Sequence, residues 1–189
     1  MYYKLIVIGT SAGGLDAMKN ILPKLPPAFP VPVVVVQHIS PQSDGFMIHY
    51  LNGISSIRVK EAEEKELLKP ATVYFAPPNY HLLIEDDHTL ALSVDMKVNY
   101  ARPSIDVLFE SAAYVYGSDL IGVLLTGANN DGAEGLSKIK RFGGYTIVQN
   151  PDTAYSDSMP RSALAKMDPD QILNLEDIGN VLRDIFMKK

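Results

Sequence analysis

Short apolar runs rich in valine and isoleucine recur along the chain, and each of them predicts a buried strand. They span residues 5–8, 33–36, 120–125 and 145–148. Nearly continuous hydrophobicity is typical of strands that are covered on both faces in a parallel sheet. We therefore expect these four runs to pair in such a sheet.

Segments with the spacing of an amphipathic helix lie between these runs and near the end of the chain, at residues 15–22, 105–116, 136–142 and 178–187. Alternation of strands and helices predicts an α/β fold, with a doubly wound, mostly parallel sheet and helices on both faces. Residues 74–76 and 81–94, with the turn EDDHT inside the second segment, predict an antiparallel hairpin at one edge of the sheet. The length of 189 residues indicates a single domain over 1–189.

The net charge of -5 and the absence of cysteine narrow the possible functions. A nucleic-acid-binding protein needs a basic surface to displace the counterions of phosphates, so we expect no nucleic-acid partner. Without cysteine there is no thiolate nucleophile, and no pair of histidines has ligand spacing, so we expect no metal and no cofactor. No stretch approaches the roughly 20 apolar residues of a membrane span, and the first residues do not form a signal peptide. These features predict a cytoplasmic protein without membrane insertion.

The first apolar run leads into Gly9-Thr10-Ser11-Ala12-Gly13, which fits the pattern G-x-S-x-G. In this pattern the glycines let the chain turn sharply from strand to helix and leave the serine hydroxyl exposed above the sheet. The same five residues are also compatible with an anion-binding turn or with a purely structural one. Other residues must decide between these three interpretations.

A serine nucleophile needs a base, and His38 is the best placed of the four histidines. It follows VVVVQ, at the carboxyl end of a predicted strand, which is the edge where α/β sheets build ligand sites. Asp131, in LLTGANNDGAEG, lies at the same edge and is suited to orient the imidazole, although capping the next helix is an alternative role for it. Together, the three loops favour a Ser-His-Asp triad, in a chain order that differs from the Ser, acid, His order of α/β-hydrolases.

These stretches resemble the catalytic domain of the protein-glutamate methylesterases of bacterial chemotaxis, the CheB type. The likeness covers nearly the whole chain through VIGTSAGG, VVQHI, KEAEEKELLKPATVYFAPPNYHLLI, RPSIDVLFESAA, GVLLTGANNDGAEGL, GGYTIVQNPDTA and SMPRSAL. The resemblance places the nucleophile, base and carboxylate of the family on Ser11, His38 and Asp131. It implies hydrolysis of glutamate γ-methyl esters on the cytoplasmic helices of a methyl-accepting or similar coiled-coil receptor, and deamidation of receptor glutamines as a second activity of the family.

The resemblance also directs attention to residues around the triad. Backbone N–H groups in the turns 11–13 and 126–130 are the candidate oxyanion donors, and these turns include Ala12, Gly13 and Ala128. The family commonly has methionine where this chain has Ala128, so the substrate specificity differs if side-chain bulk shapes the pocket.

Two further residues are assigned to the site by resemblance only. Arg102 is expected to meet carboxylates near the target on a receptor helix, and a surface arginine paired with Asp106 is the alternative. Met159 is expected either to line the pocket or to belong to the core.

Chemotaxis methylesterases usually carry a phosphorylatable receiver domain, whereas the printed chain begins one strand before Ser11. We therefore expect a catalytic domain without that receiver. It is either a free-standing esterase, which is constitutive or regulated by a partner protein in place of the receiver, or a domain excised from a longer protein. A non-catalytic interaction or regulatory module with the methylesterase fold is the alternative function. A nucleotide-binding protein is a third class, and only the glycine turn supports it.

Overall fold

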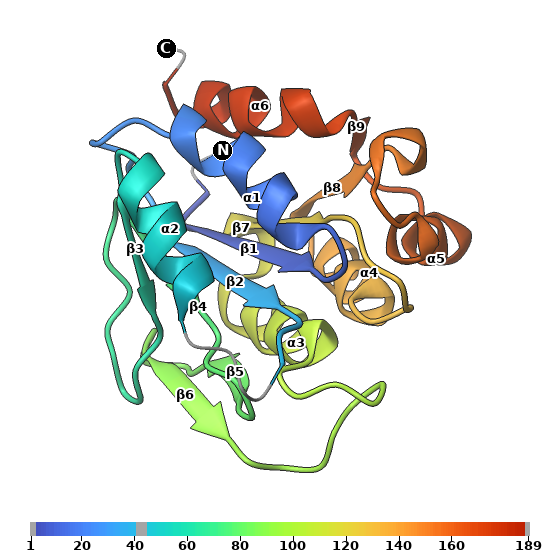
Figure 1. Cartoon of the computed structure of the whole chain (residues 1–189). Helices are drawn as coiled ribbons and strands as arrows, with labels where there is room; N and C mark the ends of the chain where they lie inside the picture. Colours follow the sequence, from blue (N-terminus) through green and yellow to red (C-terminus); the bar gives the residue numbers. More distant parts are fainter. Residues whose placement is uncertain (1–2, 41–44, 188–189) are drawn as a thin grey trace.

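The computed structural model describes residues 3–40 and 45–187, and its centre is a seven-stranded sheet (Figure 1). The strand order is β3-β4-β2-β1-β7-β8-β9, and all neighbouring strands are parallel. The strands are β1 Leu5–Thr10, β2 Val33–Gln37, β3 Arg58–Glu61, β4 Thr72–Phe75, β7 Leu120–Leu124, β8 Tyr145–Gln149 and β9 Gln171–Leu173. The predicted parallel α/β sheet is confirmed.

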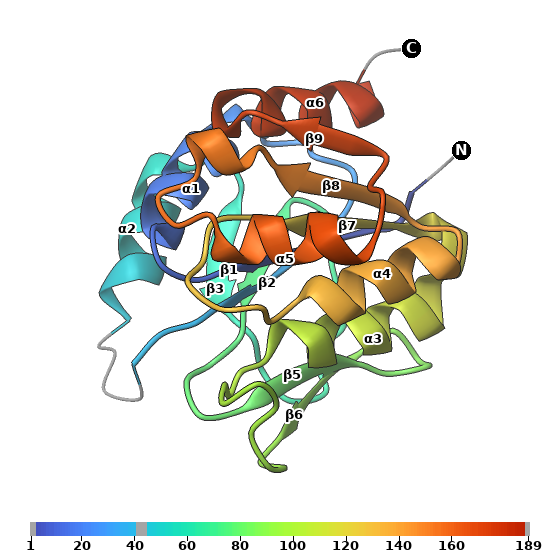
Figure 2. The same ribbon diagram turned by 90° about the vertical axis from the view of Figure 1, so that its right-hand side faces the viewer.

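Helices cover both faces of this sheet (Figures 1 and 2). One face packs on α1 Gly14–Ile21, α2 Phe46–Ile54 and α6 Leu175–Met187, and the other on α3 Ile105–Tyr116, α4 Ala133–Arg141 and α5 Ser158–Lys166. Short 3₁₀ turns connect elements at η1 Leu22–Lys24, η2 Gly117–Asp119 and η3 Pro151–Thr153. Because successive side chains of a strand point to opposite faces, Leu5 and Val7 of β1 enter one core while Ile6 and Ile8 enter the other.

The predicted antiparallel hairpin is present as β5 His81–Ile84 and β6 Leu90–Ser93. Its strands form a separate two-stranded sheet and do not hydrogen-bond to the edge of the main sheet. The hairpin packs on α3, where the Ile84 N–H donates to Ser111 Oγ at 3.1 Å. Figures 1 and 2 both place it at the opposite end of the molecule from α6.

Residues 74–76 do not belong to this hairpin, so that part of the prediction is wrong. Tyr74 and Phe75 lie in β4, which pairs in parallel with β2 on one side and β3 on the other. Both side chains are only 1% exposed, and an interior strand buries its residues in this way. Pro77 and Pro78, which lack a backbone N–H, then separate β4 from the hairpin.

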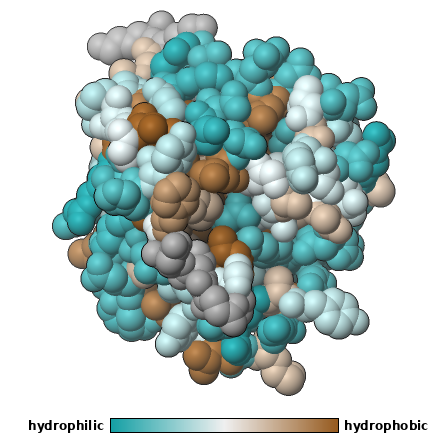
Figure 3. All heavy atoms as spheres, in the orientation of Figure 1, coloured by the Kyte–Doolittle hydropathy of each residue, from teal (hydrophilic) through white to brown (hydrophobic). Residues whose placement is uncertain are grey.

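Hydrophilic side chains cover most of the face in Figure 3, and apolar side chains appear there in small separate patches. Within residues 3–40 and 45–187, no helix combines the length and the hydropathy that a membrane span requires.

Parallel pairing of β1 with β2 and β7 brings the carboxyl ends of these three strands together. The loops that follow are joined by backbone hydrogen bonds, from the Ser11 N–H to the Thr126 carbonyl at 2.9 Å and from the His38 N–H to the Thr10 carbonyl at 3.1 Å. The three predicted site residues, Ser11, His38 and Asp131, follow these strands and therefore lie at this edge of the sheet.

Candidate active site

Ser11, His38 and Asp131 form one hydrogen-bonded chain of side chains. His38 Nδ1 lies 3.2 Å from Ser11 Oγ, and His38 Nε2 lies 2.8 Å from Asp131 Oδ2. Ser11 follows β1, His38 follows β2, and Asp131 lies between β7 and α4. The structure thus brings together three predicted residues that are up to 120 positions apart in the sequence (131 minus 11).

Asp131 is fully buried and accepts hydrogen bonds from the amino end of α3. Oδ2 accepts from the Ile105 N–H at 2.7 Å, while Oδ1 accepts from Ser104 Oγ at 2.8 Å and from the Asp106 N–H at 3.2 Å. Burial by itself would raise the pKa of Asp131, but hydrogen bonds from His38, the Ile105 N–H and Asn99 hold this pKa below its ordinary value. Asp131 is therefore a carboxylate at neutral pH.

The alternative role considered for Asp131, capping the helix that follows it, is wrong. Gly132 occupies the N-cap position of α4, and no side chain caps that helix. Asp131 instead contacts the amino end of α3. The N–H groups there have no acceptor within the helix, and together with the helix dipole they favour a negative charge.

The partner of Nε2 fixes the tautomer of His38. Since a carboxylate can only accept a hydrogen bond, Nε2 carries the ring proton that it donates to Asp131. Nδ1 is then unprotonated, and its lone pair can accept a hydrogen bond from the Ser11 hydroxyl. Asn129 lies on the same side of the ring, with Nδ2 3.4 Å from Nδ1, and its Oδ1 accepts from the Asp131 N–H at 3.1 Å.

Buried polar side chains tie the backbones of the three loops together. Gln37 Nε2 donates to the carbonyls of Ser11 and His38, at 2.9 Å in each case. Thr126 Oγ1 donates to the Ala12 carbonyl at 2.8 Å. The sequence interpretation missed Gln37 and Thr126, although a polar residue directly after a buried apolar run is a signal that could have identified both.

The turn after Ser11 offers unused hydrogen-bond donors. The Ser11 N–H is occupied by the Thr126 carbonyl. Within the described part of the chain, no acceptor is bound by the N–H groups of Ala12, Gly13 or Ala128. Gly13 has φ +82°, and a Cβ added there would lie 2.4 Å from Tyr155 Cβ, so this position requires glycine.

Arg102 does not form the ion pair with Asp106 that was considered for it. Its Nη1 donates to the carbonyls of Val94 at 2.7 Å and Asp95 at 3.0 Å, which holds the loop after β6. Met159 is fully buried, and its Sδ would lie only 1.8 Å from a Cβ added at Gly127. Met159 therefore contacts the 126–130 turn from the core.

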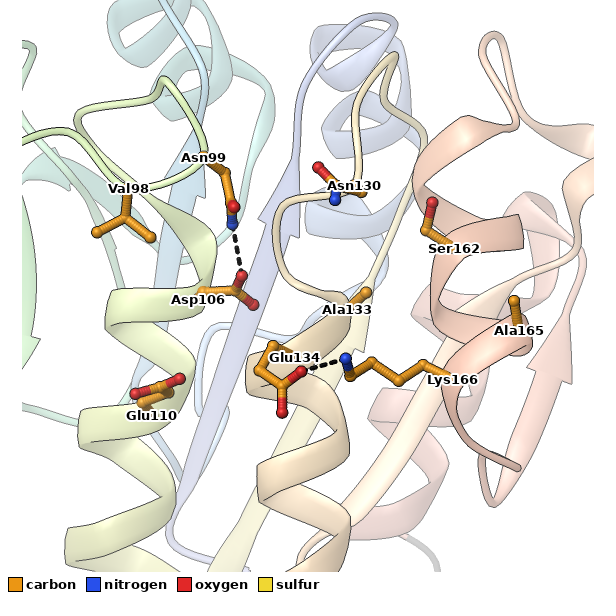
Figure 4. Close-up of a pocket in the computed structure, with 10 residues that line it drawn as sticks. All are labelled: Val98, Asn99, Asp106, Glu110, Asn130, Ala133, Glu134, Ser162, Ala165 and Lys166. Atoms are coloured by element: carbon orange, nitrogen blue, oxygen red, sulfur yellow. Dashed lines mark hydrogen bonds and ion pairs between the residues drawn. The ribbon is translucent and has the colours of Figure 1, made fainter.

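A pocket of about 700 Å³ lies beside the triad, between α3, α4 and α5 (Figure 4). Asn99 and Asn130 line its upper part, and Asp106, Glu134 and Lys166 line its interior. Ser11 and His38 are not among the lining residues. Among the described residues, no group of three or more His, Cys, Asp or Glu is arranged to hold a metal ion.

Comparison with known proteins identifies the family. Residues 6–182 match the model of the CheB methylesterase family. A protein of Leptospira interrogans is 56% identical over 181 residues, which cover 96% of this chain and 94% of that protein. The protein-glutamate methylesterase/protein-glutamine glutaminase 1 of Carboxydothermus hydrogenoformans is 42% identical over 185 residues, and these cover 95% of this chain and 51% of that longer relative.

The fold leads to the same family. The crystal structure of the Thermotoga maritima CheB methylesterase catalytic domain matches with a TM-score of 0.93 at 36% identity, over 98% of this chain and 100% of the other. A family match over almost the whole chain and a shared fold at this identity leave one assignment: the chain belongs to the CheB methylesterase family.

Proposed function

We propose that residues 1–189 act as one catalytic domain, a serine hydrolase that demethylates glutamate γ-methyl esters on the cytoplasmic helices of a chemoreceptor. Ser11 is the nucleophile, His38 the general base and Asp131 the carboxylate that orients the imidazole. One observation carries the proposal: His38 bridges the Ser11 hydroxyl and a buried carboxylate through its two ring nitrogens, at 3.2 and 2.8 Å. The names of the relatives support this reaction.

The first half of the reaction forms an acyl-enzyme. His38 Nδ1 takes the hydroxyl proton while Ser11 Oγ attacks the ester carbonyl carbon, and the resulting imidazolium faces the Asp131 carboxylate. The tetrahedral intermediate collapses when the carbon–oxygen bond to the methoxy group breaks. The proton on Nδ1 passes to that oxygen, and methanol leaves.

The second half consumes water and restores the enzyme. Nδ1 accepts a proton from a water molecule whose oxygen attacks the acyl carbon, and the bond to Ser11 Oγ then breaks with return of the proton to the serine. The products are a glutamate side chain and free Ser11. Deamidation of a receptor glutamine follows the same steps, with ammonia in place of methanol.

Backbone donors stabilise the oxyanion in this proposal. The N–H groups of Ala12, Gly13 and Ala128 suit the role because they bind no acceptor among the described residues, whereas the Ser11 N–H does. Use of the backbone explains why alanine suffices at position 128. Arg102 and Met159 act indirectly here, through the 94–95 loop and the 126–130 turn that they contact.

The proposed partner is the cytoplasmic helical region of a chemoreceptor, which places the protein in the cytoplasm. This assignment rests on family membership, since the CheB methylesterase family acts in chemotaxis.

Methanol release from a methylated chemoreceptor cytoplasmic fragment tests the function. We expect release by the wild-type chain and a loss of at least about 10³-fold in Ser11→Ala, because the nucleophile is removed. Ser118→Ala is the matched control, since Ser118 precedes β7 and so lies at the opposite edge of the sheet, and it should retain wild-type activity. Equal release by wild type and Ser11→Ala would refute the triad, and no release by the wild type would favour the non-catalytic module.

A further inference from the structure

A second buried carboxyl group lies next to the proposed triad. Asp106, in the first turn of α3, is 6% exposed. Its Oδ1 accepts from the Gly135 N–H of α4 at 2.7 Å, and its Oδ2 accepts from Asn99 Nδ2 at 2.7 Å (Figure 4). The catalytic cycle proposed above makes no use of this group.

Asn99 joins this carboxyl group to Asp131. Its Nδ2 lies 2.7 Å from Asp106 Oδ2 and 3.1 Å from Asp131 Oδ1. A side-chain amide nitrogen carries two hydrogens, so it can donate one to each carboxylate. The single amide group of Asn99 is therefore a bridge between the two acids, even though the residue as a whole lies exposed at the rim of the pocket.

A tight turn sets the position of the bridging amide. Asn99 and Tyr100 have φ +50° and +63°, and Val98 and Ala101 exchange two backbone hydrogen bonds of 3.1 and 2.9 Å across them. Asparagine is one of the few residues that adopt positive φ readily in such a turn. The turn leaves Tyr100 98% exposed while the Asn99 amide reaches both carboxylates.

The bridge depends on the ionised form of Asp106. A carboxylate offers two acceptor oxygens, which the Gly135 N–H and the Asn99 amide both use. A protonated carboxyl group carries a hydrogen on one of its two oxygens. An asparagine in its place has an NH₂ group where one of the oxygens was. The buried Gly135 N–H keeps the remaining acceptor, since it has no other partner among the described residues, so the added hydrogen falls on the side of Asn99. The Asn99 amide is then no longer held in its position toward Asp131.

The surroundings of Asp106 contain both acids and bases. The titratable and charged groups on the elements around it are Asp131 in the β7–α4 loop, Glu110 on α3, Glu134 and Lys138 on α4, Lys166 on α5 and His81 on β5. Burial raises the pKa of Asp106 to about 6, and the negative charge of Asp131 adds to this effect, while the Gly135 N–H opposes it. Asp106 is thus ionised at pH 7 and above.

On the basis of the proposed function, we propose that Asp106 is a positioning residue which, through Asn99, holds the Asp131 carboxylate in line with His38, and that protonation of Asp106 weakens the esterase. Asp106 touches neither the substrate nor the serine in this scheme. It acts on the geometry of the Asp131–His38 pair alone.

The test compares Asp106→Asn with a matched control, Glu110→Gln, by measuring kcat/KM for methanol release from pH 5 to 8.5. Glu110 lies one helical turn further on and lines the same pocket, but it pairs with Lys138 and does not bond to the bridge. Asp106→Asn should lower kcat/KM on the order of 10-fold at pH 8, as expected for one lost hydrogen bond to a charged group. The wild-type to variant ratio should approach about 1 near pH 5, where the wild type itself carries a neutral Asp106. The ratio for Glu110→Gln should stay near 1 at pH 8, where Asp106 is ionised in both proteins. Around pH 6 this variant should be slightly more active than the wild type, because loss of the Glu110 charge lowers the pKa of Asp106.

A second variant keeps the test decisive if Asp106→Asn folds poorly. Asn99→Gly tolerates the positive φ of the turn and removes only the bridging amide. It should reduce kcat/KM by a similar factor, and the double variant should be no worse than Asn99→Gly alone, since both changes break one bridge. Thermal unfolding of each variant measures the fraction folded.

The outcomes separate this inference from the proposed function. A pH-independent ratio for Asp106→Asn, or additive losses in the double variant, overturns the positioning role while a Ser11-dependent wild-type activity upholds the esterase. Absence of wild-type activity, or activity that survives Ser11→Ala, overturns the esterase and with it the positioning role.

Discussion

Substitution of Asp131 by asparagine would remove one acceptor oxygen from a buried group that five donors share. Two donors, His38 Nε2 and the Ile105 N–H, reach Oδ2. Three donors reach Oδ1, and they are Ser104 Oγ, Asn99 Nδ2 and the Asp106 N–H. An asparagine can place its one oxygen on only one of these sides, so its orientation decides which donors lose their acceptor.

The donor count favours the unproductive orientation. With the amide oxygen on the Oδ1 side, three donors keep their acceptor, and inside the buried site the Ile105 N–H alone faces another donor, because His38 can shift its proton. The proton moved to Nδ1 also meets the Asn129 amide, but that contact is long, at 3.4 Å, and only partly buried. The opposite orientation leaves the Asn99 amide and the Asp106 N–H facing the new NH₂ group. A buried donor without an acceptor costs about 1–3 kcal/mol, so the first orientation should dominate by roughly 10-fold or more.

In that orientation the variant amide donates to His38 Nε2. The ring proton then resides on Nδ1, which faces Ser11 and can no longer accept the hydroxyl proton. The imidazolium also loses its counter-charge in the transition state. Together these effects should reduce kcat/KM about 10³- to 10⁴-fold, which is the range typical of the same change in Ser-His-Asp enzymes.

The assay is kcat/KM for methanol release at pH 7.5, together with ¹⁵N NMR of the His38 ring to locate its proton. Asp119→Asn is the matched control, because Asp119 precedes β7 at the far edge of the sheet and pairs with Lys4. An Asp131→Asn variant within about 10-fold of wild type, or one whose ring proton stays on Nε2, would refute the reasoning.

Two further predictions concern the support of the site. In Gly14→Ala, the new Cβ would lie 1.7 Å from Gln37 Oε1, so Gln37 must move away from the carbonyls of Ser11 and His38. We expect kcat/KM to fall at least about 10-fold and the unfolding midpoint to drop, and an alanine variant with unchanged kinetics would contradict this. The second prediction concerns stability. The pKa of Asp106 rises from 3.8 to about 6 on folding, so the folded chain binds this proton more tightly than the unfolded chain. The contribution of Asp106 to the free energy of unfolding therefore decreases as the pH rises from about 4 to 6. Denaturant unfolding should show the wild type losing about 2 kcal/mol relative to Asp106→Asn over that range, and a constant difference would contradict the pKa.

The parallel sheet could be predicted because burial on both faces leaves a pattern in the sequence. β1, β2, β7 and β8 coincide with runs that have almost no polar residues. β3 and β9 were not predicted, because these edge strands are only 4 and 3 residues long, and of all their residues Val59 alone is buried. β4 has an apolar sequence, but nothing local indicates that it lies between β2 and β3.

The sequence by itself selected Ser11, His38 and Asp131, because each follows a predicted strand and parallel strands end at a common edge. Only the tertiary structure decided what surrounds them. Asn99 reaches Asp131 across 32 residues of sequence, and Asp131 contacts α3 where a cap of the following helix was the local alternative. Hydrophobic periodicity is a local property of the chain, whereas the partner of a buried polar group depends on which segments fold against it, and that is decided only when the chain has folded.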